Sequence, residues 1–158
     1  MMLKKKSALS ALFTTLLLAG VSTAYADEGN CMPIGGVAIA NFVAQNDGTT
    51  TIVAALSGSV EATSGKIVAQ RETKTGLEMD MEHYFMNDKG GFIHTKDLGI
   101  LTRVEGQKDR YMIEITYDVQ EGNSRGVLKG YKGTFNSYGL VDLKNMEGQV
   151  RYSGKICK

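Results

Sequence analysis

The sequence predicts an all-β fold, a single antiparallel closed β-barrel of about eight strands. Several short runs alternate apolar and polar residues, which is the period of a strand with one face toward a core and one toward water. The 19 glycines separate these runs, and no stretch of eleven residues carries the i, i+3, i+4 apolar stripe of a helix. Without helices to cover sheet edges, closure into a barrel is favoured over an open sheet. A β-sandwich is the alternative.

The N-terminal residues have the three parts of a secretory signal peptide. Three lysines at 4–6 precede an apolar run from Ala8 to about Val21, which is too short to span a bilayer comfortably. The small-x-small site at residues 24–26 follows. We therefore expect cleavage after Ala26, a single barrel domain at 27–158, no stable membrane insertion afterwards, and a periplasmic or secreted location. An uncleaved N-terminal anchor is the alternative.

The charge of the mature chain argues against some partners. The leader carries three lysines and no acidic residue, so 15 Lys and Arg remain against 17 Asp and Glu. Because no basic cluster is present, we expect no nucleic acid as partner. A chain of this length is ordinary for one domain with one core. No cofactor is predicted, and the oligomeric state stays open.

The two cysteines lie close to the two ends of the mature chain. Cys31 and Cys157 are most simply a disulfide in an exported protein. Such a bridge holds its two Cα atoms within about 6 Å, which is natural when the first and last strands of a sheet pair with each other. A reactive or metal-binding thiol pair is the alternative, although the sequence has neither Cys-x-x-Cys nor a neighbouring histidine.

Turn signals divide the mature chain into strand candidates. Asn46-Asp47-Gly48 tolerates positive φ and predicts a hairpin between the first two strands. Glycine-containing turns are also predicted at 74–76, 87–91 and 121–123. The predicted strands are 35–44, 49–58, 66–73, 77–86, 92–95, 100–106, 111–119, 126–135, 138–143 and 149–156.

The stretch LEMDMEHYF, residues 77–85, decides which face of its strand looks inward. Glu78, Asp80 and Glu82 alternate with the odd-numbered residues Leu77, Met79, Met81, His83 and Phe85. Burying three carboxylates about 7 Å apart without evident counterions would cost several kcal/mol each. The odd-numbered residues, His83 included, are therefore predicted to face the interior. The same alternation turns Tyr111, Tyr117 and Tyr152 inward.

The run GVLKGYKGTFNSYGLVDL, residues 126–143, resembles the closing strands of the allene oxide cyclase and dirigent-like barrels. The likeness rests on a Gly-Thr-Phe strand followed by a second glycine-rich strand. It implies an eight-stranded barrel with an apolar central cavity, in a group whose members cyclise or orient apolar molecules or have no known activity. No catalytic motif matches position by position, so no functional residue is carried over.

The leading functional hypothesis is a non-enzymatic binder of a small apolar molecule. An eight-stranded barrel is just wide enough either to be filled by side chains or to hold one small molecule. Methionines adapt to irregular shapes, while an imidazole and tyrosine hydroxyls orient a ligand. A cavity of roughly a few hundred Å³ is expected for this role; a filled, dry core is the alternative. The predicted pocket residues are Met79, Met81, His83, Phe85, Tyr111 and Tyr117.

A cyclase or isomerase that uses the same cavity is the second hypothesis, with no catalytic residue assigned. Acid–base chemistry needs partners within hydrogen-bond reach, and the sequence offers only two histidines and no nucleophile motif. Asp97 and Arg103 could share a polar barrel mouth. Asp97 capping Gly99 in a turn is the simpler interpretation.

A Cu(I)-binding module is the third hypothesis. Met79, Met81, His83 and Met86 spell Met-x-Met-x-His-x-x-Met, a thioether and imidazole set that selects Cu(I). Side chains at i and i+2 start about 7 Å apart on a strand, and Met86 alternates to the opposite face. The outer carboxylates lack the loop that wraps Ca²⁺. No metal site is therefore assigned.

Overall fold

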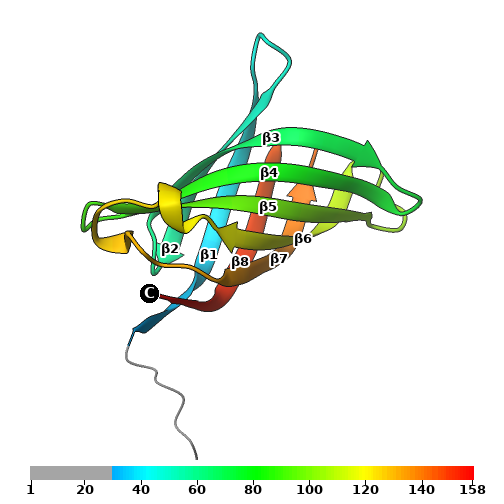
Figure 1. Cartoon of the computed structure of the whole chain (residues 1–158). Coiled ribbons are helices and arrows are strands. Elements are labelled where there is room, and N and C mark those ends of the chain that lie inside the picture. Colours follow the sequence, from blue (N-terminus) through cyan, green and yellow to red (C-terminus); the bar gives the residue numbers. More distant parts are fainter. Residues whose placement is uncertain (1–29) are drawn as a thin grey trace, which may run out of the picture.

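The structure, a computed structural model that describes residues 30–158, contains eight strands in one closed antiparallel barrel (Figure 1). Each strand pairs with its neighbours in sequence order. The predicted barrel is confirmed, and the β-sandwich alternative is not. The predicted signal peptide lies outside the described residues. The strands are β1 Cys31–Ala44, β2 Thr50–Gly58, β3 Ala62–Glu72, β4 Gly76–Asn87, β5 Gly91–Arg103, β6 Arg110–Val119, β7 Thr134–Asp142 and β8 Glu147–Cys157.

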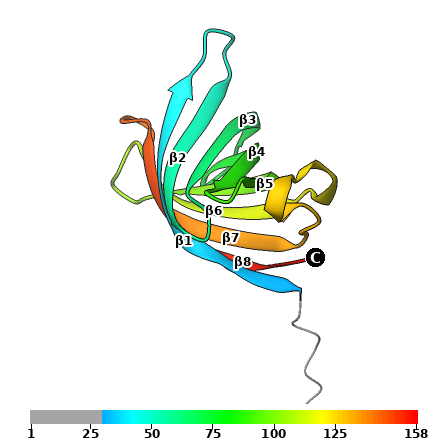
Figure 2. The same ribbon diagram turned by 90° about the vertical axis from the view of Figure 1, so that its left-hand side faces the viewer.

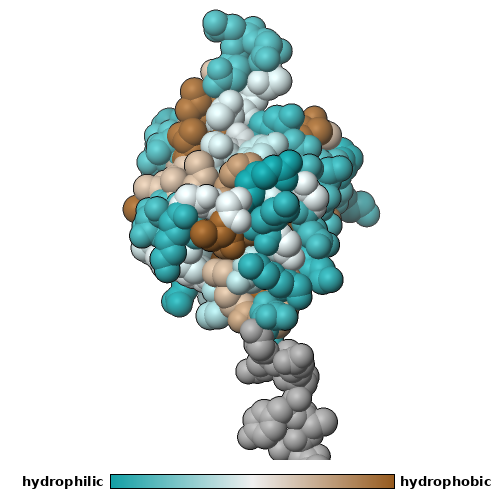
Figure 3. Space-filling view, turned by 60° about the vertical axis from the view of Figure 1, so that its left-hand side comes forward, coloured by the Kyte–Doolittle hydropathy of each residue, from teal (hydrophilic) through white to brown (hydrophobic). Residues whose placement is uncertain are grey.

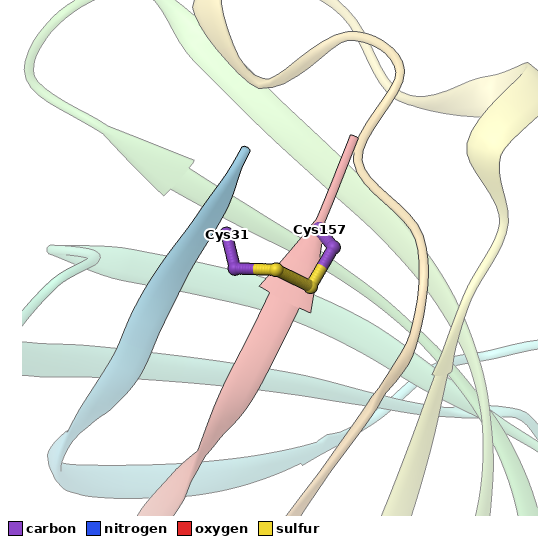
Figure 4. Close-up of a disulfide and its surroundings, with 2 residues drawn as sticks. All are labelled: Cys31 and Cys157. Carbon is purple, nitrogen blue, oxygen red and sulfur yellow. A yellow bond between two sulfur atoms is a disulfide. The ribbon is translucent and has the colours of Figure 1, made fainter. Parts of the chain in front are cut away.

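The barrel closes where the last strand pairs with the first. The β1–β8 ladder runs from Cys31 opposite Cys157 to Asn41 opposite Glu147, and Figure 2 shows β8 beside β1. A disulfide joins Cys31 and Cys157, which are 126 positions apart in sequence and have Cα atoms 4.0 Å apart (Figure 4). The predicted disulfide is thus confirmed. It indicates an oxidising, non-cytosolic compartment.

Two predicted strands, 92–95 and 100–106, are one continuous strand. β5 runs without a turn from Gly91 to Arg103 and pairs with β4 from Gly91 to Thr102. The interpretation of Asp97 as a turn residue is therefore wrong. Its side chain faces the interior in the same alternation as Ile93, Thr95 and Leu101, all of which are buried.

The predicted strand at 126–135 is mostly a loop. The connection between β6 and β7 contains two short 3-10 helices, η1 Glu121–Asn123 and η2 Gly126–Leu128, and β7 begins only at Thr134. Gly126, Gly130 and Gly133 have φ of 63°, 83° and 119°. These left-handed values are incompatible with a regular strand and are accessible to glycine at little cost. The positive φ values of these three glycines therefore prevent residues 126–133 from forming a regular strand.

The two ends of the barrel differ. One end, here called the capped end, holds the β2–β3 and β4–β5 turns, the disulfide and the segment with η1 and η2. Figure 3 turns this side forward and shows mainly hydrophilic residues with scattered hydrophobic ones. Beneath it, Val60, Ile93, Phe135 and Ile156 are at most 1% exposed and fill the interior.

The opposite end, here called the open end, holds the β1–β2 hairpin and the β7–β8 turn. The hairpin projects beyond the rest of the barrel (Figures 1 and 2), because β1 continues past Asn41, the last residue that pairs with β8. Within residues 30–158, no helix has the length and apolar character needed to cross a membrane.

Candidate functional site

The interior of the barrel contains a cavity of about 80 Å³. It extends from the level of Phe85 and His83 toward the open end, where Phe42, Thr50, Leu143 and Met146 form its rim. These four residues are half-buried, so the cavity reaches the surface between the β1–β2 hairpin and the β7–β8 turn. The volume is smaller than the few hundred Å³ expected from the sequence, because methionine and aromatic side chains fill much of the barrel.

β4 supplies most of the predicted pocket residues. Its alternation turns the odd-numbered residues inward, and Met79, Met81, His83 and Phe85 are between 2% and 5% exposed. All four line the cavity, and so does Tyr117 from β6. Tyr111 is also buried but does not line the cavity. The structure thus brings five of the six predicted pocket residues together around one space.

The outer face of β4 carries the three carboxylates, as the sequence predicts. Their counterions come from the neighbouring strand β3, which sequence reasoning did not identify. Arg71 bridges Glu78 and Asp80, with a guanidinium nitrogen 2.6 Å from Asp80 Oδ2, and Lys66 Nζ lies 3.4 Å from Glu82 Oε2. The hydrogen bond from Arg71 holds the pKa of Asp80 below its usual value. These groups belong to the solvated surface and leave the interior uncharged on this side.

His83 and Asp97 form a buried pair inside the barrel. His83 Nδ1 lies 2.6 Å from Asp97 Oδ2, and the two residues are 3% and 6% exposed. His83 stands opposite Thr95 in the β4–β5 ladder, so Asp97 is its diagonal cross-strand neighbour. Asp97 does not share a barrel mouth with Arg103. Arg103 is exposed, and its guanidinium lies over the ring of Tyr111, 5.8 Å from the centroid.

Gly65 makes room for the imidazole of His83. It stands opposite His83 in the β3–β4 ladder, and a Cβ built on Gly65 would overlap the ring edge that carries Cδ2 and Nε2. A side chain larger than hydrogen would therefore push the ring off its place beside Asp97. With Nδ1 engaged by Asp97, the Nε2 edge lies over Gly65 in the interior, and the ring borders the cavity.

Aromatic rings surround this pair. The rings of Phe85 and Tyr117 both lie 5.7 Å from that of His83, and Tyr117 stacks on Phe135 at 4.5 Å. The hydroxyl of Tyr117 lies 3.0 Å from Ser137 Oγ. Burial raises the pKa of Tyr117 well above its usual value, the Ser137 contact opposes this, and the charge of Asp97 adds to the increase. The phenol is therefore a neutral wall of the cavity.

A second buried histidine lies on the outer face of β5. His94 stacks on Tyr84 with ring centroids 4.6 Å apart, and Asn123 of η1 contacts its Nδ1 at 3.2 Å. Its Nε2 is 3.9 Å from Glu82 Oε2. This histidine anchors the connecting segment on the barrel wall and does not reach the cavity. Its position between Ile93 and Thr95, which both face the interior, was the available sequence signal.

The four residues of the Cu(I) hypothesis do not come together as a set. Met79, Met81 and His83 line the cavity, whereas Met86 is 38% exposed on the outer face of β4. No group of three or more His, Cys, Asp or Glu side chains in residues 30–158 is arranged to hold a metal ion. Chemically, the site offers an apolar space with one oriented imidazole at its inner end.

Comparisons with models of protein families, with curated proteins and with solved structures gave no match to this chain.

Proposed function

We propose that this protein is exported to the periplasm or beyond and binds one small, mainly apolar molecule inside its barrel without transforming it. The observation that carries this proposal is the interior cavity that reaches the surface at the open end, with apolar walls and His83 at its inner end. Binding sites for small molecules combine apolar walls with a few polar groups that fix orientation. The basic and apolar leader and the disulfide support export.

The size of the cavity limits the ligand. A dry cavity of roughly 150 Å³ holds benzene, and about 80 Å³ is close to half of that. The ligand is therefore a molecule of few heavy atoms, or a longer one whose narrow end enters while the rest lies at the rim. Met79, Met81 and Met146 line the space, and their flexible side chains can adapt to a guest.

The test places a larger side chain in the cavity from β2, and the control places the same side chain on the outer face of β2. Ala54 is buried and lines the cavity, whereas its neighbour Ala55 is exposed. The protein carries ¹³C-methyl methionine, and the small apolar probes xenon and cyclopropane are titrated while the methyl signals of the cavity methionines are followed. Ala54→Leu should abolish the shifts, and Ala55→Leu should preserve them. Absence of shifts in both the wild type and Ala55→Leu would contradict the proposal.

A cyclase or isomerase that uses the same cavity is the second candidate. The buried His83–Asp97 pair favours it, because an imidazole oriented by a carboxylate is a common acid–base group. Native mass spectrometry and organic extraction of protein from the source cell identify a co-purifying molecule, which is then incubated with wild type and the His83→Gln variant. The enzyme hypothesis is favoured if the wild type converts this molecule and the His83→Gln variant binds it without converting it.

A further inference from the structure

Among residues 30–158, the charge balance of the barrel interior depends on His83 and Asp97 alone. Every Lys and Arg side chain among residues 30–158 is exposed, and the buried polar residues otherwise include only Thr, Ser and His94 on the outer face of β5. Asp97 Oδ1 has no hydrogen-bond partner among the described residues. The carboxylate of Asp97 therefore has a single source of positive charge within reach, the imidazole of His83.

Two proton arrangements leave the His83–Asp97 pair with no net charge, and both place a proton on Nε2. In the first, an imidazolium donates Nδ1–H to an ionised carboxylate, and Nε2 carries the second proton. In the second, the protonated carboxyl donates to Nδ1 of a neutral imidazole, whose only proton is on Nε2. A neutral imidazole that donates Nδ1–H to an ionised Asp97 would instead bury a net negative charge with no cation in reach among residues 30–158, which is costly. Nε2–H is thus the donor that His83, which lines the cavity, has left for a guest.

We infer that the molecule bound in the barrel is a small neutral carbonyl compound whose oxygen accepts a hydrogen bond from Nε2–H of His83. This inference rests on the proposed binding function. A carbonyl oxygen satisfies the donor and brings no donor of its own into an apolar space. A carboxylate would give the interior a net negative charge, with no further buried cation among residues 30–158 to offset it. A pure hydrocarbon would leave the Nε2–H without a partner.

Three probes of nearly equal shape separate these cases. They are 2-butanone, 2-methylbut-1-ene, in which a methylene replaces the carbonyl oxygen, and propanoate, in which an oxygen anion replaces the methyl group. Each is titrated into protein labelled with ¹³C-methyl methionine. The comparison protein carries His83→Leu together with Asp97→Leu, which removes both polar partners and leaves no unpaired charge. The carbonyl stretching frequency of bound 2-butanone is recorded by infrared spectroscopy.

The affinity of 2-butanone should fall about three- to tenfold in the double variant, as expected for one hydrogen bond, while the affinity of the alkene holds or rises. The carbonyl stretch of the bound ketone should lie below its value in hexane. Propanoate should bind more weakly than the ketone.

The outcomes distinguish this inference from the function on which it rests. If neither the ketone nor the alkene binds the wild type, the binding function fails and the inference fails with it. If the alkene binds but the ketone loses no affinity in the double variant, only the inference is overturned. Propanoate that binds at least as tightly as 2-butanone also overturns it. If the double variant does not fold, a carbonyl frequency equal to that in hexane is sufficient to reject it.

Discussion

The Nδ1 atom of His83 lies 2.6 Å from the Oδ2 atom of Asp97, across the β4–β5 ladder and inside the barrel. Both side chains are almost fully buried. A buried pair of this kind contributes little net stability while both members are present, because desolvation offsets the attraction. Loss of one member alone is expected to be costly, since the other remains in an apolar interior without its partner.

The first prediction is a strongly non-additive mutant cycle at this pair. His83→Leu leaves Asp97 unpaired and should lower the free energy of unfolding by about 3–5 kcal/mol. His83→Leu combined with Asp97→Leu should recover most of that loss, because no buried polar group is left without a partner. Urea unfolding of the two single variants and the double variant measures the coupling.

The matched control for this cycle is the ion pair of Arg71 with Asp80, which joins β3 to the outer face of β4. Arg71→Ala should leave the urea midpoint almost unchanged, since exposed pairs are screened by water. Additive effects of the two interior substitutions would show that His83 and Asp97 do not depend on each other.

Alternation within single strands was the part of the structure that the sequence could predict. In residues 77–85 and 111–119 one face is consistently apolar, so the inward positions of Met79, Met81, His83 and Tyr117 followed from period two. The cysteines near both ends predicted the seam between first and last strands. These predictions needed only the order of residues within one strand or the positions of two cysteines.

The environment of Asp97 could not be predicted in the same way. An aspartate followed two residues later by glycine is typical of a turn, and the reason that this one stays in a strand lies on β4. Only the β4–β5 register brings His83 to its carboxylate. The alternation of Ile93, Thr95, Asp97 and Leu101 was the one available signal. The loop at 126–133 was missed because glycine spacing does not reveal the sign of φ.

The second prediction concerns the disulfide. Cys31 and Cys157 are 126 positions apart, and the chain-entropy model assigns roughly 4–5 kcal/mol to a closed loop of that length, as an upper estimate. Cys31→Ser with Cys157→Ser should therefore lower the free energy of unfolding by up to about 4 kcal/mol. The β1–β8 ladder should still close the barrel, so the far-ultraviolet circular dichroism should not change.

Urea titration with and without dithiothreitol provides the comparison for this prediction. Reductant should lower the midpoint of the wild type and leave the double serine variant unaffected. A serine variant that loses its β-sheet signal in the absence of urea would show that closure itself requires the disulfide.

The third prediction is a loss of stability at alkaline pH. Burial raises the pKa of Tyr117 above the ordinary value of 10.0, so the folded state keeps the phenolic proton where the unfolded chain releases it. The folded state then binds more protons than the unfolded state, and stability falls as pH rises above about 10. Below that pH both states are protonated, and the group adds no pH dependence.

Urea midpoints measured between pH 8 and pH 11 test this dependence, because that range brackets the ordinary tyrosine pKa of about 10. Tyr117→Phe should flatten the alkaline decline, although it also loses the contact with Ser137 and so starts from a lower stability. Tyr138→Phe is the control, because Tyr138 is 54% exposed on the outer face. A decline that is equally steep in Tyr117→Phe would assign the alkaline sensitivity to other groups.

The fourth prediction contrasts two methionines that line the same cavity. Met146, in the β7–β8 turn, has a φ of 56°, a left-handed conformation that disfavours a side chain by roughly 1–2 kcal/mol. Met146→Gly relieves that strain but increases the freedom of the unfolded chain. Its free energy of unfolding should therefore stay within about 1 kcal/mol of the wild type. Met81 is 3% exposed in the core, and Met81→Ala should cost about 2–5 kcal/mol.

Both substitutions should enlarge the space available to a guest, at different depths. Met81→Ala opens the inner cavity and should allow benzene to bind more tightly. Met146→Gly removes part of the rim and should mainly speed the exchange of a bound probe, which NMR line shapes report. Strained residues often mark a functional position, and a methionine at a position that suits glycine is explained if its side chain covers a bound guest. Unchanged exchange rates in Met146→Gly, together with lost stability, would show that Met146 serves only packing.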